Sequence, residues 1–135
     1  MIALWILVIW GHSMQSAVIS AGESGFFLTF FAKILPGIFG GESGEFILRK
    51  MAHGTEYLIL GLLSATDQWQ VGKRQFRDLI SVLYFGLGIA FIDETIQLFV
   101  KGRSGEVRDI WIDFAGVCIG TLLVHIIGKL LCKRR

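Results

Sequence analysis

The sequence has few of the residues that are common in secreted or nucleic-acid-binding domains. Its 135 residues include one proline and two cysteines, only 18% are charged, and the formal net charge is +2. This small charge, with no basic tract in the interior, predicts no nucleic-acid partner. Cys118 lies within an apolar run and Cys132 in a basic tail, so we expect no disulfide and see no zinc-type spacing.

Apolar residues dominate the chain. Hydrophobic residues make up 53% of it, and the mean hydropathy is +0.63. A soluble domain of this length rarely carries so much apolar content. The composition therefore favours a single integral membrane domain over residues 1–135. The first apolar run lacks a preceding basic region and a small-residue cleavage site, so we interpret it as a retained helix.

Four apolar segments predict an all-α membrane protein with four transmembrane helices. They cover residues 1 to about 19, about 50 to 66, 79–100 and 110–131. A helix that crosses a bilayer needs roughly 20 residues. The aromatic stretch 26–39 is shorter and stops at Pro36-Gly37, which predicts an extra interfacial or re-entrant helix. The glycine-rich residues 40–45 predict a loop.

Basic residues predict the orientation of these helices. Lys73, Arg74 and Arg77 lie between the second and third segments, and Lys133-Arg134-Arg135 follow the fourth. Cytoplasmic loops of membrane proteins carry an excess of Lys and Arg. We therefore expect both termini on the cytoplasmic side of a multi-pass protein.

Helix lengths place four polar residues at one depth. At about 1.5 Å per residue, Ser13, His53, Asp93 and Asp113 each lie roughly 18–24 Å from the cytoplasmic ends of their segments. Residues a hundred positions apart thus meet in one plane toward the outer face. Ionisable groups inside a membrane are costly and usually functional, so this convergence predicts a site.

The second segment presents most of its polar residues on one face. Arg49, His53, Glu56 and Tyr57 are spaced at i, i+4, i+7 and i+8, and Lys50 lies one turn before His53. His53 suits a general acid or base because its unperturbed pKa lies near neutrality. It equally suits a neutral hydrogen-bond partner of Glu56 or Asp93.

The third segment ends in an acidic and amide group. Asp93 and Glu94 each share a helix face with Gln97. If their environments differ, the two acids can serve as an acid and a base. The alternative is a structural ion pair with Arg103 or with the basic residues 49–50.

The fourth segment carries Asp109 and Asp113 on one face, which continues through Gly116 and Gly120. This Gly-x-x-x-Gly spacing permits close helix contact and turns the acidic stripe toward the bundle. Together with the carboxylate of Glu94 and the side-chain amide of Gln97, these acids offer oxygen ligands for a divalent cation such as Mg²⁺ or Ca²⁺. We favour neutralisation of the nearby basic residues instead, and assign no metal and no cofactor.

Two further polar residues have competing interpretations. Arg103, in a glycine-flanked loop, suits a bound phosphate or carboxylate, or a salt bridge to Asp109. Ser13 could act as a nucleophile near the histidine, although a packing role is favoured. We expect His12 and His125 to lie outside the site.

Together these motifs resemble the VanZ-like family of membrane proteins. Residues 49–57 are similar to its first signature, and Asp93-Glu94-x-x-Gln97, residues 102–105, Asp109 and Asp113-x-x-Gly116 to its second. Ser13-Met14-Gln15 is similar to its Ser-x-Gln element, although Ser16 stands where proline commonly follows. The resemblance covers nearly the whole chain. It implies a four-helix protein of the bacterial cytoplasmic membrane associated with teicoplanin resistance, and it implies no settled reaction.

Two functions of different classes follow from these residues. In the first, an envelope protein holds a lipid-tailed or glycopeptide ligand and so reduces drug access to its target, with membrane lipids as its other partners. Its ligand-binding residues are Arg49, Lys50, Tyr57, Gln97, Arg103, Asp109, Asp113, Ser13 and Gln15. In the alternative, an intramembrane hydrolase or transferase acts on a lipid-linked envelope substrate. Its acid and base groups are His53, Glu56, Asp93 and Glu94.

Overall fold

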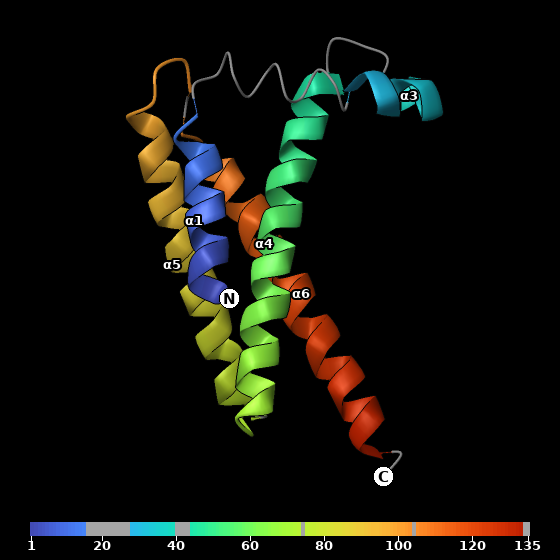
Figure 1. Ribbon diagram of the computed structural model, residues 1–135, viewed down its shortest axis with the longest axis vertical. Helices are drawn as coiled ribbons and strands as arrows, with labels where there is room; N and C mark the ends of the chain where they lie inside the picture. The colour runs from blue at the N-terminus through green and yellow to red at the C-terminus, as the bar shows by residue number, and fades with distance from the viewer. Residues whose placement is uncertain (16–27, 40–43, 74, 104, 134–135) are drawn as a thin grey trace.

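The computed structural model describes residues 1–15, 28–39, 44–73, 75–103 and 105–133, and the regular structure in these ranges is entirely helical (Figure 1). The helices are α1 (Ile2–Ser13), α3 (Pro36–Phe39), α4 (Gly44–Gln70), α5 (Phe76–Leu98) and α6 (Val107–Lys133). Residues 28–34 are also helical. The all-α prediction is therefore confirmed for the described part of the chain.

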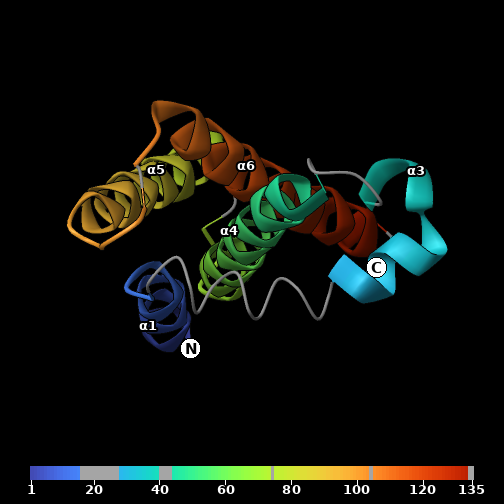
Figure 2. The same cartoon turned by 90° about the horizontal axis from the view of Figure 1, so that it is seen from above.

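The three long helices α4, α5 and α6 alternate in direction and form the body of the molecule (Figure 1). α1 is shorter and packs beside the upper half of this body, against α5 and α4. Seen from above, α1 and α6 lie on opposite sides of the α4–α5 pair (Figure 2). The short α3 lies to one side of the upper end of α4 (Figures 1 and 2) and contacts that helix. The upper end of the bundle thus receives residues from every helix.

Glycines let α4 and α6 approach each other closely. A Cβ atom built on Gly116 would overlap the carbonyl oxygen of Gly54, and one on Gly120 would overlap that of Leu58. On α4, a Cβ on Gly61 would come within 2.5 Å of the carbonyl oxygen of Val117. The prediction that the Gly-x-x-x-Gly face turns toward the bundle is confirmed. This contact fixes the rotation of α6 and directs Asp113 inward.

Below the polar level, apolar side chains from all four helices pack together. The cluster comprises Ile9, Tyr57, Leu60, Val82, Ile89, Ala90 and Val117. Burial of this kind stabilises a fold through close packing and exclusion of water. The cluster therefore forms an apolar layer, the apolar floor, beneath the polar residues.

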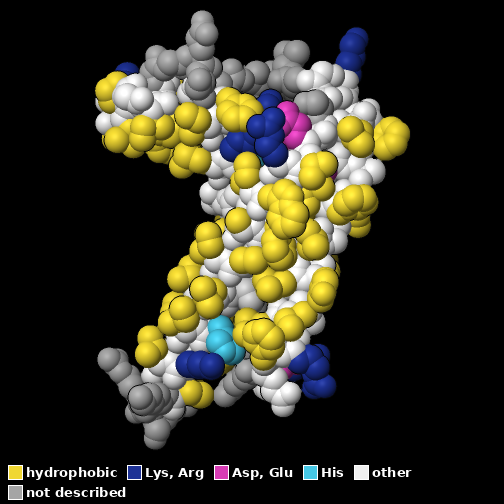
Figure 3. Space-filling model, turned by 180° about the vertical axis from the view of Figure 1, so that it is seen from behind, with side chains coloured by type: hydrophobic (Ala, Val, Ile, Leu, Met, Phe, Trp, Pro, Cys, Tyr) yellow, Lys and Arg dark blue, Asp and Glu magenta, His cyan; other side chains and the backbone are white. Residues whose placement is uncertain are grey.

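Two helices are long and apolar enough to cross a membrane, namely α5 and α6. Hydrophobic side chains cover the middle of the face shown in Figure 3, with Lys and Arg toward both ends. At 27 residues α4 is about 40 Å long, but its upper part carries charged residues. With 12 residues, α1 extends only about 18 Å. Length and composition thus support two of the four predicted spans, and the other two stay a prediction.

Several helix boundaries differ from those predicted. α4 begins at Gly44 rather than near residue 50, because its polar first turns extend a helix that hydropathy alone does not detect. α1 ends at Ser13, so Met14 and Gln15 do not continue it toward residue 19. The predicted extra helix is interrupted at Leu35, as expected for a residue that precedes proline. The predictions for residues 16–19, 26–27, 40–43, 74, 104 and 134–135 lie outside the described residues.

Candidate functional site

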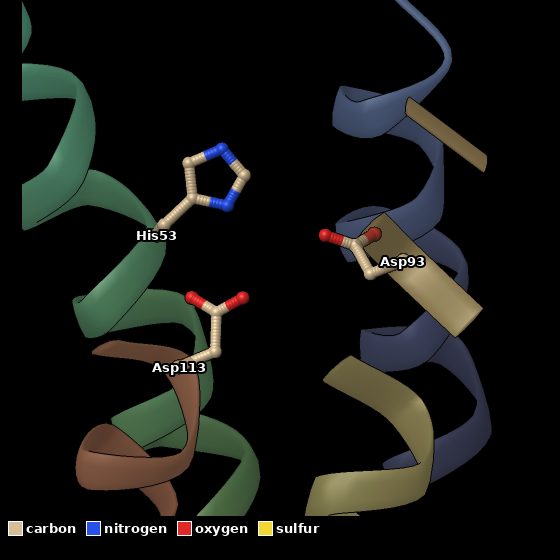
Figure 4. A group of neighbouring side chains, drawn as sticks. All are labelled: His53, Asp93 and Asp113. Carbon is tan, nitrogen blue, oxygen red and sulfur yellow. The ribbon is translucent and has the colours of Figure 1, made fainter. Parts of the chain in front are cut away.

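Three helices bring His53, Asp93 and Asp113 together in the upper half of the bundle. One ligand-type atom from each side chain lies within 4.8 Å of the other two. His53 and Asp113 extend from α4 and α6, and the Asp93 carboxylate points toward them from α5 (Figure 4). The predicted common depth of these three residues is confirmed, although their chemical roles stay predictions.

Several polar atoms of this cluster have no hydrogen-bond partner among the described residues. Asp93 and Asp113 are completely buried. Within the part of the chain that the structure describes, both oxygens of Asp113, Oδ1 of Asp93 and Nδ1 of His53 accept or donate no hydrogen bond. Burying such groups without partners is costly. A proton, a water molecule, a cation or a ligand must therefore satisfy them.

Gln97 links the two acids at the end of α5. Its Nε2 donates to Oε1 of Glu94 at 2.9 Å and, more weakly, to Oδ2 of Asp93 at 3.4 Å. The other Glu94 oxygen accepts the backbone N–H of Glu106 at 2.9 Å. Glu94 therefore ties the loop between α5 and α6 to the bundle, whereas Asp93 keeps one oxygen toward the cluster.

The α5–α6 loop also places Arg103 over the cluster. Gly102 has a φ of 82°, a conformation that favours glycine, and the chain turns there. Arg103 then shares a polar pocket with Arg49 and His53. Burial and, after it, the positive charge of Arg49 lower the pKa of Arg103. Two guanidinium groups are thus close enough to repel each other.

The carboxylates pair with these cations differently from the predicted alternatives. Lys50 forms the ion pair with Asp109, and both side chains are mostly buried. Among the described residues, neither Arg49 nor Arg103 has a carboxylate ion-pair partner. Of the two alternatives considered for Arg103, the salt bridge to Asp109 is therefore not formed among the described residues, because Lys50 reaches Asp109 across the α4–α6 contact.

His12 belongs to the site, contrary to the prediction. Its Nδ1 lies 2.5 Å from Oε1 of Glu56. Trp5, two turns earlier on α1, donates its indole N–H to the backbone oxygen of Glu56 at 2.9 Å. His12 directly precedes Ser13, which the sequence places at the same depth as His53. Its position in the sequence could therefore have indicated that it lies near the site. His125 does lie elsewhere, with its ring 5.5 Å from that of Trp69.

The remaining predicted residues surround the same region. Ser13 is completely buried, and its hydroxyl has no hydrogen-bond partner among the described residues. Tyr57 is also completely buried and joins the apolar floor. Gln15 lines a cleft beside the cluster. Of the acids and histidines predicted to form the site, His53, Asp93 and Asp113 thus meet in one cluster.

Two cavities adjoin the cluster. The larger is a cleft of about 450 Å³, lined by Trp5, His12, Gln15, Phe31, Leu48, Arg49, Met51, Ala52, His53, Thr55, Glu56, Ile59 and Arg103. The smaller, of about 50 Å³, is lined by Arg49, Lys50, His53, Gln97, Gly102, Arg103, Glu106 and Asp109. Arg49, His53 and Arg103 line both cavities. A largely apolar cleft therefore meets a polar pocket at two cations and a histidine.

Residues 1–128 match the sequence profile of the VanZ/LLP1 family. The match includes every helix except the last residues of α6. No curated protein and no solved structure matches the chain.

Proposed function

The chain belongs to the VanZ/LLP1 family of membrane proteins, and from this premise we propose that it binds an anionic, lipid-tailed ligand of the bacterial cell envelope. The observation that carries the proposal is the junction of the apolar cleft with the polar pocket at Arg49, His53 and Arg103. Ligand sites commonly combine an apolar cavity with a few polar groups that orient the ligand.

The polar pocket suits a phosphate or carboxylate head group. Arg49 and Arg103 line it with no described carboxylate partner, whereas Lys50 is neutralised by Asp109. Guanidinium groups bind phosphate and carboxylate through paired hydrogen bonds. An anion between Arg49 and Arg103 would also relieve their mutual repulsion, so the charge balance favours an anionic ligand.

The larger cleft suits an acyl or prenyl tail. Its apolar wall includes Phe31, Met51 and Ile59. Its volume of about 450 Å³ falls within the range of roughly 300–1,000 Å³ for small-molecule sites. Lipid-linked wall intermediates and lipoglycopeptides of the teicoplanin type share this combination of tail and anionic head.

In the orientation that we propose, the site faces the extracytoplasmic side and four helices contact the membrane. Lys73, Arg77 and Lys129 lie near the opposite ends of α4, α5 and α6, which are then cytoplasmic by the positive-inside rule. Ligand would enter from the outer leaflet, and sequestering it there would reduce the access of a lipoglycopeptide to its target.

Binding by the purified protein in detergent tests this function. Fluorescently labelled teicoplanin and a polyprenyl-phosphate are the two probes, and a glycopeptide without an acyl chain is the matched comparison. We expect the tailed probes to bind and Arg103→Ala to weaken them at least tenfold, with Lys73→Ala as a basic control at the far end. Equal binding of tailed and tailless glycopeptides, or an unaffected Arg103→Ala variant, would overturn the proposal. The stronger of the two tailed probes identifies the ligand source.

A second function, an intramembrane hydrolase or transferase, is favoured by one observation. His53 and two buried carboxylates from separate helices converge within 4.8 Å, as acid and base groups do in many active sites. A binding protein requires the cations more than this cluster. If His53→Gln and Asp93→Asn abolish resistance in cells while ligand binding and expression are unchanged, the enzymatic function replaces simple binding.

A further inference from the structure

We propose that His53, Asp93 and Asp113 together bind one divalent transition-metal ion. The three side chains come from α4, α5 and α6 and offer one imidazole nitrogen and two carboxylate oxygens. These three ligands differ from the set that the sequence suggested, which combined Asp109 and Asp113 with side-chain oxygens of α5. This proposal stands whether or not the protein binds a lipid-tailed ligand.

The hydrogen bonding of the neighbouring acids selects these three ligands. Asp109 is held by Lys50, and Glu94 is held by Gln97 and the backbone of Glu106. Asp113, by contrast, is completely buried with neither oxygen bonded to a described residue. Its carboxylate points toward the His53 ring, and the Asp93 carboxylate faces both side chains from the other side (Figure 4). A buried carboxylate with this surrounding needs a positive partner.

The spacing is close to that of a metal site. With ligand atoms at most 4.8 Å apart, an ion at their centre lies about 2.8 Å or less from each. Zinc bonds to nitrogen and oxygen are roughly 2.0–2.2 Å long. Side-chain rotations that move each ligand atom by less than about 1 Å therefore close the site, and the helices need not move.

A second layer of contacts supports the ligands. Gln97 donates to Oδ2 of Asp93 and leaves Oδ1 facing the cluster. Such hydrogen bonds orient metal-binding carboxylates. The Tyr57 hydroxyl, which is buried without a described partner, lies one helical turn beyond His53. Water or a ligand head group would fill the remaining coordination positions of the ion.

The ligand types indicate a first-row transition ion such as Zn²⁺ or Mn²⁺. Imidazole suits Zn²⁺ and the two carboxylates also suit Mn²⁺, whereas Mg²⁺ and Ca²⁺ prefer all-oxygen sites. Two ionised aspartates balance the charge of the ion. Arg103 is the adverse neighbour, since its positive charge acts on both Asp93 and His53. An anionic head group between the ion and Arg103 would offset that repulsion.

Metal binding by the full chain in detergent tests this proposal. Protein stripped with a chelator is titrated with Zn²⁺, Mn²⁺ or Mg²⁺, and bound metal is measured after desalting. Cobalt absorption spectra report the coordination directly. We expect about one Zn²⁺ or Mn²⁺ per chain and at least a tenfold loss of affinity in Asp113→Asn and His53→Gln. Asp67→Asn, an exposed acid at the far end of α4, and His125→Gln are the matched controls, and we expect both to bind normally.

The outcomes separate this proposal from the proposed function. Wild-type protein that binds neither transition ion, prefers Mg²⁺, or binds equally well after Asp113→Asn overturns the metal site. If the Asp113→Asn variant aggregates, the Asp93→Asn variant takes its place. The cobalt spectrum of the wild-type protein must in either case show mixed nitrogen and oxygen ligands. Lipid-tail binding that persists without metal overturns neither proposal, because the cleft and Arg103 account for it.

Discussion

Gly116 of α6 lies directly against the backbone of Gly54 of α4, the residue after His53. A Cβ atom at position 116 would overlap the Gly54 carbonyl oxygen and come within 2.9 Å of the Leu58 backbone nitrogen. Gly116 is also one turn from Asp113. A close contact between the two helices therefore lies beside the residues that form the cluster, and it limits how near His53 and Asp113 can come.

Replacing Gly116 with alanine should destabilise the protein and open the cluster. The added methyl group meets backbone, which cannot rotate away, and overpacking of this kind costs about 1–3 kcal/mol. We expect a lower thermal midpoint in a fixed detergent, together with weaker metal binding. Gly88→Ala on α5 is the control, because no atom lies within 4 Å of the added Cβ. Equal midpoints for the two variants would contradict the close α4–α6 contact.

The Lys50–Asp109 pair should show energetic coupling. Both side chains are 13% exposed, so removing one partner leaves the other charge partly buried. We expect Lys50→Met and Asp109→Asn each to lower stability, and the double variant to lose less than the sum by about 1 kcal/mol. A double-mutant cycle from denaturation midpoints measures this. Additive losses would mean that the two side chains do not interact in the folded protein.

His12 should contribute to ligand binding through Glu56. Its Nδ1 contacts Oε1 of Glu56, and both residues line the cleft. Because one hydrogen bond has a net value of about 0.5–1.5 kcal/mol, His12→Ala should weaken binding of the tailed probe roughly 2- to 10-fold. The histidine at the other end of the bundle supplies the control His125→Ala, which should bind normally. If His12→Ala binds the probe as tightly as the wild type, the contact between His12 and Glu56 does not contribute to ligand binding.

Sequence reasoning found the convergence of His53, Asp93 and Asp113 because helix rise is nearly constant. Counting residues from one end of alternating helices therefore gives relative depth correctly. Rotation about each helix axis is also readable where glycines mark a contact face, as Gly116 and Gly120 do. Depth along each helix and rotation about its axis were therefore enough to predict the common level of the three residues and the inward direction of Asp113.

The partners of individual charges were less predictable. Arg103 was the cation considered for Asp109, whereas the crossing of α4 and α6 brings Lys50 to it. The cleft was not predicted at all, because it depends on the packing of α1 and residues 28–34 against α4. His12 was missed for a related reason: its partner Glu56 is 44 residues away in the sequence.

Gln97 should hold the carboxylates of Asp93 and Glu94 in their orientation. Its side chain is 5% exposed and joins Asp93 to Glu94. In Gln97→Leu both carboxylates lose a donor, and leaving a buried acceptor unsatisfied costs about 1–3 kcal/mol. We expect a lower unfolding midpoint and weaker metal binding, since Asp93 is no longer oriented. Thr95→Ala, on the exposed side of the same helical turn, is the control. If Gln97→Leu were as stable as that control and bound metal normally, the bridge between the two acids would have no structural role.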